Sequence, residues 1–208
     1  IFFALSAAGR VPCMINYTDT PANILLCIKN AGIKKIYTSK DFIAESNLES
    51  VIQKLSDNGI KLFYVEDLKD SLKITEKLFA YLMSFFPRYY YKIINKNIDI
   101  SGPAVILFTT GRGAKTKSVV LSHKNVQALR AQFSSVMDFG IQDSFFNAMP
   151  AFHSFGIIAG MLFPLLRAIK VFMYHSPLHY RTVSELVYDT NSTVILGTDT
   201  FLCGYAKT

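Results

Sequence analysis

Val105-Ile-Leu-Phe-Thr-Thr-Gly-Arg-Gly-Ala-Lys-Thr-Lys-Ser-Val-Val-Leu-Ser-His123 is the stretch of this 208-residue chain that decides its fold. An apolar run over residues 104–108 changes into a polar segment with two glycines and three cations, and a second apolar run follows at residues 119–121. Short apolar runs bounded by polar and glycine residues are typical of strands. The stretch is therefore predicted to form a strand, a loop and a second strand.

The loop between these strands has the composition of a polyphosphate site. Gly111 and Gly113 can adopt backbone angles that turn several amide N–H groups toward one point. Such amides, with Arg112 and Lys117 beside them, suit the charge of a polyphosphate. A Walker A loop is an alternative, but Thr116 stands where that pattern needs a glycine, and a β-type run follows where it needs a helix.

The loop also resembles the phosphate loop of the adenylate-forming ligases, whose pattern is close to TSGSTGxPKG between two strands. The matching positions are Thr109, Thr110, Gly111 and Lys117. The departures are Arg112, Ala114, Thr116 and Ser118, and Gly113 stands one place early. The resemblance implies that Thr109, Thr110, Gly111, Gly113 and Lys117 bind ATP together with Mg²⁺.

Composition indicates a globular chain, because half of its residues are hydrophobic. The net charge of +7 could suggest a nucleic-acid or membrane partner, but the cations are dispersed along the sequence, so a solvated basic surface is the interpretation. The three tyrosines of residues 87–92 could stack on bases. A linker whose rings lie on the protein is favoured, and no nucleic-acid partner is predicted.

The cysteines and the apolar runs limit the cellular setting. Cys13, Cys27 and Cys203 are odd in number, lie in apolar surroundings and lack CxxC spacing, so we expect buried thiols in a reducing compartment. No apolar run reaches the roughly 18 residues of a membrane helix. The start of the chain is expected to lie inside a domain and not to be a signal peptide.

The first half of the chain alternates strand and helix patterns. Thr20 and Pro21 form a helix start, Gly32 ends that helix, and the strand 35–38 follows. Ser46 or Asn47 caps a second helix that ends at Asn58-Gly59, before a strand at 61–65. A helix over residues 70–86 comes next. Short connections between such elements are typical of parallel βαβ units, so the predicted fold is a layered α/β structure.

The second half continues this alternation. Ser122 is predicted to cap a helix that ends near Gly140. Strands are expected at 145–150, 169–173 and 192–196, and helices at 155–166, at 180–188 and after Thr198. We divide the chain into a first α/β portion, residues 1–100, with a Tyr/Lys-rich linker, and a second portion, residues 101–208, of the same domain. The resemblance implies that this second portion holds the phosphate loop and an acyl pocket.

His153 is the histidine that chemistry could use, because it lies between a strand end and a helix start, the usual position of ligand groups in open α/β sheets. A lone histidine can equally be a structural residue. No metal site is predicted from the other three histidines, His123, His175 and His179. A Gly-x-Ser-x-Gly elbow, the mark of many serine hydrolases, does not occur in the sequence.

Three further stretches strengthen the resemblance: Met149-Pro-Ala-Phe-His-Ser-Phe-Gly156, Ser176-Pro-Leu-His-Tyr180 and Gly197-Thr-Asp-Thr-Phe-Leu-Cys-Gly-Tyr-Ala206. They are similar to the acyl-acyl-carrier-protein synthetase half of bifunctional 2-acylglycerophosphoethanolamine acyltransferases, one branch of the adenylate-forming ligases. The resemblance implies the incomplete N-terminal domain of such a ligase. His153 would lie beside the carboxylate being activated, as catalytic and substrate-binding residue. The acyl tunnel would be lined by Gly197, Thr198, Asp199 and Thr200.

The implied reaction joins a fatty acid to acyl carrier protein, or to CoA, through an acyl adenylate. The chain is expected to end before the adenine-binding, ribose-binding and lid segments of the family, so a missing C-terminal ligase portion is an expected partner. The alternative is a non-catalytic remnant of a broken ligase gene. The implied location is the cytoplasm or the inner face of a bacterial membrane, with membrane association only through the full-length protein.

Overall fold

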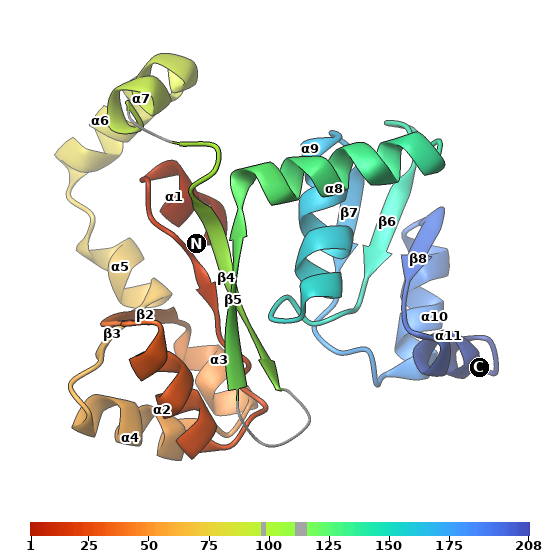
Figure 1. The fold of residues 1–208 in the computed structure, drawn as a ribbon, viewed down its shortest axis with the longest axis horizontal. Coiled ribbons are helices and arrows are strands. Elements are labelled where there is room, and N and C mark those ends of the chain that lie inside the picture. The colour runs from red at the N-terminus through yellow and green to blue at the C-terminus, as the bar shows by residue number, and fades with distance from the viewer. Residues whose placement is uncertain (97–98, 111–115) are drawn as a thin grey trace. The chain divides into compact units, whose positions relative to one another are not determined.

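The computed structural model describes residues 1–96, 99–110 and 116–208 (Figure 1). The described residues form two compact units. The first unit comprises Ile1–Pro12, Tyr17–Asp99 and Thr110–Ser118, and the second comprises Cys13–Asn16, Ile100–Thr109 and Val119–Thr208. The sequence analysis divided one domain into two portions at residue 100. That division is of a different kind from these compact units, and it stays a prediction.

The first unit is built around two parallel strands, β2 (Lys35–Thr38) and β3 (Lys61–Tyr64), with Lys35 opposite Lys61. Its helices are α1 (Phe2–Ala7), α2 (Pro21–Asn30), α3 (Lys40–Glu45), α4 (Glu49–Asp57), α5 (Val65–Ser71), α6 (Ile74–Ser84) and α7 (Pro87–Ile94). Because β2 and β3 are parallel and joined through α3 and α4, the βαβ unit predicted from the sequence is confirmed.

Side-chain caps explain where two of these helices begin. Thr20 accepts the N–H of Asn23 at 3.4 Å and Pro21 is the first helical residue of α2, as the sequence predicts. Ser39 accepts the N–H of Phe42 at 3.3 Å and so begins α3, a helix that the sequence reading missed. The predicted cap of α4 at Ser46 or Asn47 is wrong, because Leu48 holds the N-cap position without a side-chain bond.

Two predictions after β3 are wrong. The single helix expected over residues 70–86 is interrupted, because Leu72 and Lys73 are extended between α5 and α6. The expected linker at residues 87–92 is helix α7, which Pro87 opens at the first helical position. Its tyrosines are exposed, although the ring of Tyr90 contacts Phe79 of α6.

The quoted stretch forms the two strands that the sequence predicts. Strand β4 (Pro103–Thr110) lies between β1 (Cys13–Met14), which is parallel to it, and β5 (Thr116–Ser122). The N–H of His123 donates to the carbonyl of Gly102 at 3.1 Å, so the end of β5 meets the start of β4. These two strands therefore run in opposite directions.

The third sheet of the described residues, with strand order β7-β6-β8, is fully parallel. Its strands are β6 (Ser144–Asn147), β7 (Lys170–Met173) and β8 (Val194–Leu196). The helices of this unit are α8 (His123–Val136), the π-helix η1 (Phe155–Leu162), α9 (Phe163–Leu166), α10 (Tyr180–Asp189) and α11 (Asp199–Tyr205). Among the helices in the described part of the chain, none has both the length and the apolar character needed to cross a membrane.

The core of the second unit lies on both faces of strand β6. Phe145 packs against Phe163 of α9 and Ile169, whereas Phe146 packs on the other face against Val183 of α10 and Tyr205 of α11. Successive residues of a strand point to opposite faces, and a parallel sheet buries both. The α/β fold with parallel strands that the sequence predicts is thus confirmed.

The thiols differ from the prediction in one case. Cys27 is buried on α2 and Cys13 is half-buried on β1, whereas Cys203 on α11 is exposed. Cys203 therefore lies on the outer face of its helix, while Tyr205 of the same helix packs into the core.

Candidate functional site

The predicted phosphate loop is described only at its two ends. Thr109 is an exposed residue near the end of β4, and Thr110 ends that strand. Lys117 is the second residue of β5 and is exposed. Gly111 and Gly113 lie outside the described residues, so the shape of the loop and its amide directions stay predictions.

Thr116 and Lys117 show how β5 begins within the first unit. Thr116 is buried beside Cys27 of α2. Burial raises the pKa of the Cys27 thiol, and the Thr116 hydroxyl partly opposes that rise. Because side chains alternate along a strand, the inward Thr116 leaves Lys117 pointing outward, in keeping with its exposure.

The other predicted residues follow strands of the β7-β6-β8 sheet. His153 lies in the segment after β6, and Gly197 to Thr200 come directly after β8. Since these two strands are parallel neighbours, their carboxyl ends meet at one edge of the sheet. The fold therefore brings His153 and Gly197–Thr200 to a common edge. In open α/β sheets this edge is the usual position of a ligand.

Asn147, the last residue of β6, organises the segment that carries His153. Its side chain is fully buried; Nδ2 donates to the carbonyl of Gly156 at 3.0 Å, and Oδ1 accepts the N–H of Met149 at 3.0 Å. These bonds tie both ends of the segment to the strand. The sequence reading missed Asn147, although a single amide inside an apolar run was a visible signal.

Two glycines let η1 pack tightly over this segment. A Cβ atom added at Gly156 would lie 2.2 Å from the carbonyl oxygen of Pro150, and one added at Gly160 would lie 2.3 Å from Cγ of Asn147. Neither position has room for a methyl group. The π-helical geometry of η1 begins at Phe155, directly after the His153 segment, and such turns recur at functional sites.

His153 is held by its backbone and exposes its ring. Its N–H donates to the carbonyl of Pro150 at 3.0 Å, and its own carbonyl accepts the N–H of Ile157 at 3.0 Å. The imidazole is exposed and stacks obliquely on Phe152, with 4.6 Å between the ring centroids. The backbone is thus fixed by the turn while the imidazole faces outward.

The segment after β8 exposes further polar groups. The carbonyl of Thr198 accepts the N–H of Leu202 at 3.0 Å, which starts α11 as predicted, but the Thr198 hydroxyl makes no capping bond. The side chains of Thr198, Asp199 and Thr200 are exposed, and Gly197 is half-buried. Hydroxyl and carboxylate groups are therefore presented near the carboxyl end of β8.

The segment after β7 brings two more histidines to this edge, which the sequence reading did not predict. Tyr174 Oη lies 3.0 Å from Nδ1 of His179, and the rings of His175 and His179 are 5.3 Å apart in an edge-to-face arrangement. The Tyr205 hydroxyl donates to the carbonyl of Pro177 at 2.9 Å, which fixes the segment to α11. Within residues 1–96, 99–110 and 116–208, no group of three or more potential metal ligands occurs.

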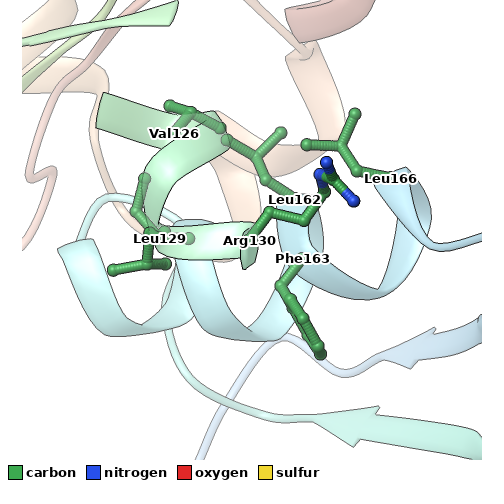
Figure 2. Close-up of a pocket in the computed structure, with 7 residues that line it drawn as sticks. Val126, Leu129, Arg130, Leu162, Phe163 and Leu166 are labelled. Carbon is green, nitrogen blue, oxygen red and sulfur yellow. The ribbon is translucent and has the colours of Figure 1, made fainter. Parts of the chain in front are cut away.

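A hollow lies elsewhere in the second unit, between α8 and the run formed by η1 and α9 (Figure 2). Its empty volume is about 150 Å³, a value that includes space open to solvent. Its lining residues are Val126, Leu129, Arg130, Ile158, Leu162, Phe163 and Leu166. The lining is apolar except for Arg130, whose Nε donates to Oε1 of Gln127 at 2.8 Å. None of the predicted site residues lines this hollow, which is a gap in the packing between helices.

Comparison with known proteins identifies relatives across this chain. The sequence model of the AMP-binding enzyme family matches residues 1–204. Long-chain fatty acid transport protein 5 of Mus musculus is 26% identical over 165 residues, which are 78% of this chain and 23% of that protein. Probable CoA ligase CCL8 of Humulus lupulus is 23% identical over 161 residues, which are 77% of this chain and 25% of that protein. The chain thus spans about a quarter of these relatives.

Solved structures share the fold. The O-succinylbenzoate CoA synthetase of Bacillus subtilis in complex with AMP superposes with a TM-score of 0.75 at 15% identity, covering 99% of this chain and 47% of that one. ATP-bound MatB from Rhodopseudomonas palustris gives a TM-score of 0.73 at 16% identity, covering 100% of this chain and 38% of that one. At these identities the likeness concerns the fold.

Proposed function

Because the chain belongs to the AMP-binding enzyme family, we propose that it forms part of a ligase that activates a fatty acid with ATP. In the first step a carboxylate oxygen of the fatty acid attacks the α phosphorus of ATP, and pyrophosphate leaves. In the second step a carrier thiol attacks the acyl carbonyl, and AMP leaves. The printed names of the two sequence relatives, a long-chain fatty acid transport protein and a CoA ligase, support this class of substrate.

We propose that the ends of β4 and β5 hold the phosphates. Thr109, Thr110 and Lys117 flank the loop, and Gly111 and Gly113 would supply amides within it. ATP arrives as its Mg²⁺ complex, and Lys117 would add positive charge where the pyrophosphate leaves. The exposure of Lys117 beside the buried Thr116 supports this role, because the amine faces away from the packed interior.

The observation that carries the proposal is the shared edge of the parallel sheet. His153 after β6 and Gly197 after β8 lie at the carboxyl ends of neighbouring strands. There the exposed imidazole of His153 would contact the carboxylate under attack. The acyl chain would pass Gly197, Thr198, Asp199 and Thr200. The buried Asn147 would act as a positioning residue, because it holds the turn on which His153 stands.

For the acceptor we propose acyl carrier protein, with CoA as the alternative. The stretches around His153 and Gly197 resemble acyl-acyl-carrier-protein synthetases, whereas one sequence relative is named a CoA ligase. Both acceptors end in the same pantetheine thiol, so the chemistry is shared. Supplying each acceptor in turn and measuring the acyl thioester formed would distinguish them. The proposed location is the cytoplasm, where both acceptors occur, or the inner face of the membrane.

Fatty-acid-dependent exchange between ATP and pyrophosphate tests the first step, in the protein that contains this chain. We expect exchange with fatty acids, and a loss of about tenfold or more for Lys117→Ala and for His153→Ala. Lys54→Ala, which removes an exposed amine from α4, is the matched control and should leave the exchange unchanged. A folded protein that shows no exchange with any fatty acid would instead support the non-catalytic alternative.

A further inference from the structure

Helices α6 and α7 form a segment of the first unit with no buried residue (Figure 1, yellow to yellow-green). Twelve large hydrophobic side chains between residues 74 and 94 are exposed. The exposed fraction reaches 84% for Ile74, 63% for Phe86 and 68% for Tyr89. Monomeric soluble proteins rarely expose apolar side chains in such density, and dense patches mark interaction surfaces.

The two helices form a hairpin that is anchored at one end. The rings of Phe79 on α6 and Tyr90 on α7 meet edge to face, with 6.2 Å between their centroids. After α7, Nδ2 of Asn95 donates to the carbonyls of Ala7 and Tyr91 at 2.8 and 3.0 Å. The end of the hairpin is thus tied to α1 of the same unit, while its apolar side chains stay exposed.

The charges of the hairpin are almost all positive. Its five cations are Lys73, Lys77, Arg88, Lys92 and Lys96. The sole acid between residues 73 and 96 is Glu76, whose carboxylate accepts the N–H of Lys73 at 2.8 Å. In the described part of the chain, none of the five cations has a carboxylate within ion-pair distance. The hairpin therefore carries a strong positive charge beside its apolar surface.

We propose that the α6–α7 hairpin docks on the surface of a bilayer that contains anionic lipid. Phenylalanine and isoleucine side chains can enter the boundary between headgroups and acyl chains, where tyrosine rings also collect. Lysine and arginine on the same hairpin pair with anionic headgroups. A second copy of the hairpin would face it with equal positive charge, which disfavours self-association. The proposal adds a lipid contact to the ligase and does not depend on its reaction.

Vesicle flotation with the full chain tests this docking. One set of vesicles is phosphatidylcholine with a quarter phosphatidylglycerol, and the other is phosphatidylcholine alone. We expect binding to the anionic set that weakens as salt is raised. Each cation removed should lower the partition coefficient about fivefold, which corresponds to about 1 kcal/mol per charge. The charge variant is Arg88→Gln with Lys92→Gln, for which we expect a loss of about 25-fold.

A second variant, Phe85→Ser with Phe86→Ser, removes apolar contacts at the turn between the helices and should also reduce binding. The matched controls are Lys54→Gln on α4 and Tyr188→Ser on α10, since Tyr188 is 83% exposed. Both controls should bind as the parent chain does. Circular dichroism checks that every variant folds, and the exposure of the changed side chains makes folding the expected result.

Equal binding to both sets of vesicles would overturn the proposal, as would variants that bind like the parent chain. The proposal would also be overturned if the chain does not bind vesicles but forms dimers that the Phe85 and Phe86 substitutions abolish. That result would make the hairpin an interface between copies of this chain.

Discussion

The two parallel sheets use short strands of similar length but differ in burial. In the first unit, β2 and β3 have no other strand partner among the described residues, and neither contains a buried residue. In the second unit, β6 has a neighbour on each side, and Phe145, Phe146 and Asn147 are at most 1% exposed. A central strand covered by helices on both faces is thus the rigid element, and it carries the His153 segment.

The difference indicates where function can be positioned. A side chain after β6 follows a strand that has a hydrogen-bonded neighbour on each edge and packed side chains on each face. A side chain after β2 or β3 follows a strand of a two-stranded sheet. Rigid scaffolds that support polar segments are the usual arrangement in binding sites. Four pairs of substitutions would break or sharpen the comparison.

The largest effect is expected for Phe146→Ala. This ring is fully buried among residues of α10 and α11, so its removal should lower the free energy of unfolding by about 3–5 kcal/mol. The matched change, Phe63→Ala on β3, removes a half-buried ring stacked on Tyr37 and should cost roughly 1–2 kcal/mol. Urea unfolding measures both, and equal losses would contradict the contrast between the sheets.

A glycine pair gives the next contrast. Gly156→Ala places a methyl group 2.2 Å from a backbone carbonyl, and such overpacking should cost about 1–3 kcal/mol. Gly59→Ala meets no atom within 4 Å but must keep a φ of +76°, which should cost about 1 kcal/mol. Only Gly156→Ala should speed amide exchange in the His153 segment. Faster exchange there in both variants would argue against local coupling.

Capping bonds come third. Ser122 accepts the N–H of Asn125 at 3.1 Å, and Oδ1 of Asn125 accepts the N–H of Ser122 at 3.0 Å. Ser122→Ala should cost about 1 kcal/mol, because it removes the hydroxyl that accepts the N–H of Asn125 and donates to Oδ1 of Asn125, whereas the bond from the Ser122 N–H remains. Thr20→Ala removes a longer bond of 3.4 Å, so a smaller loss is expected. Thermal unfolding of the two variants ranks the caps, and the reverse order would contradict this reading.

The smallest effects concern two half-buried carboxylates, Asp143 and Glu66. The pKa of Asp143 is lowered by the N–H of Gly140 and then by the hydroxyl of Thr193, and that of Glu66 chiefly by the hydroxyl of Ser39. A carboxylate with a lowered pKa stabilises the fold above its unfolded value of about 4 and loses this contribution as the pH falls through the folded value. Asp143→Asn and Glu66→Gln should therefore lower the melting temperature at pH 7.

The difference between these variants and the parent chain should shrink at pH 2.5, because a falling pH protonates the parent carboxylates and removes their contribution to stability. Melting curves at both pH values make the test. A difference that persists unchanged in acid would show that the side chains act through shape and not through charge.

The sequence predicted features whose causes are local. Thr20 and Ser122 begin helices because a side-chain oxygen reaches an N–H three residues later. The strands around the quoted stretch were predictable from their apolar runs. In contrast, the break between α5 and α6 depends on the extended backbone of Leu72 and Lys73, for which no proline or glycine gives a signal.

The position of the site could be predicted from the sequence, but the hydrogen bonds that hold its segment in place could not. That His153 follows a strand could be read from the sequence, whereas the contacts of Asn147 with Met149 and Gly156 require the folded chain. No role was predicted for the histidines after β7, His175 and His179, yet the parallel sheet brings them to the same edge. The roles of Lys117 and of the glycines stay predictions.

The order of strands in the β7-β6-β8 sheet also has a consequence during synthesis on the ribosome. Strand β6 is the first strand of this sheet to leave the ribosome. Its residue Phe145 pairs with Val194 of β8, so β6 lacks this neighbour until β8 has been synthesised. Synthesis of the roughly 50 intervening residues takes about 2–10 s at 5–20 residues per second. For that time the nascent chain presents an apolar strand with at least one open edge, which is the kind of surface that chaperones recognise. We expect β6 to be the first strand that such a chaperone protects.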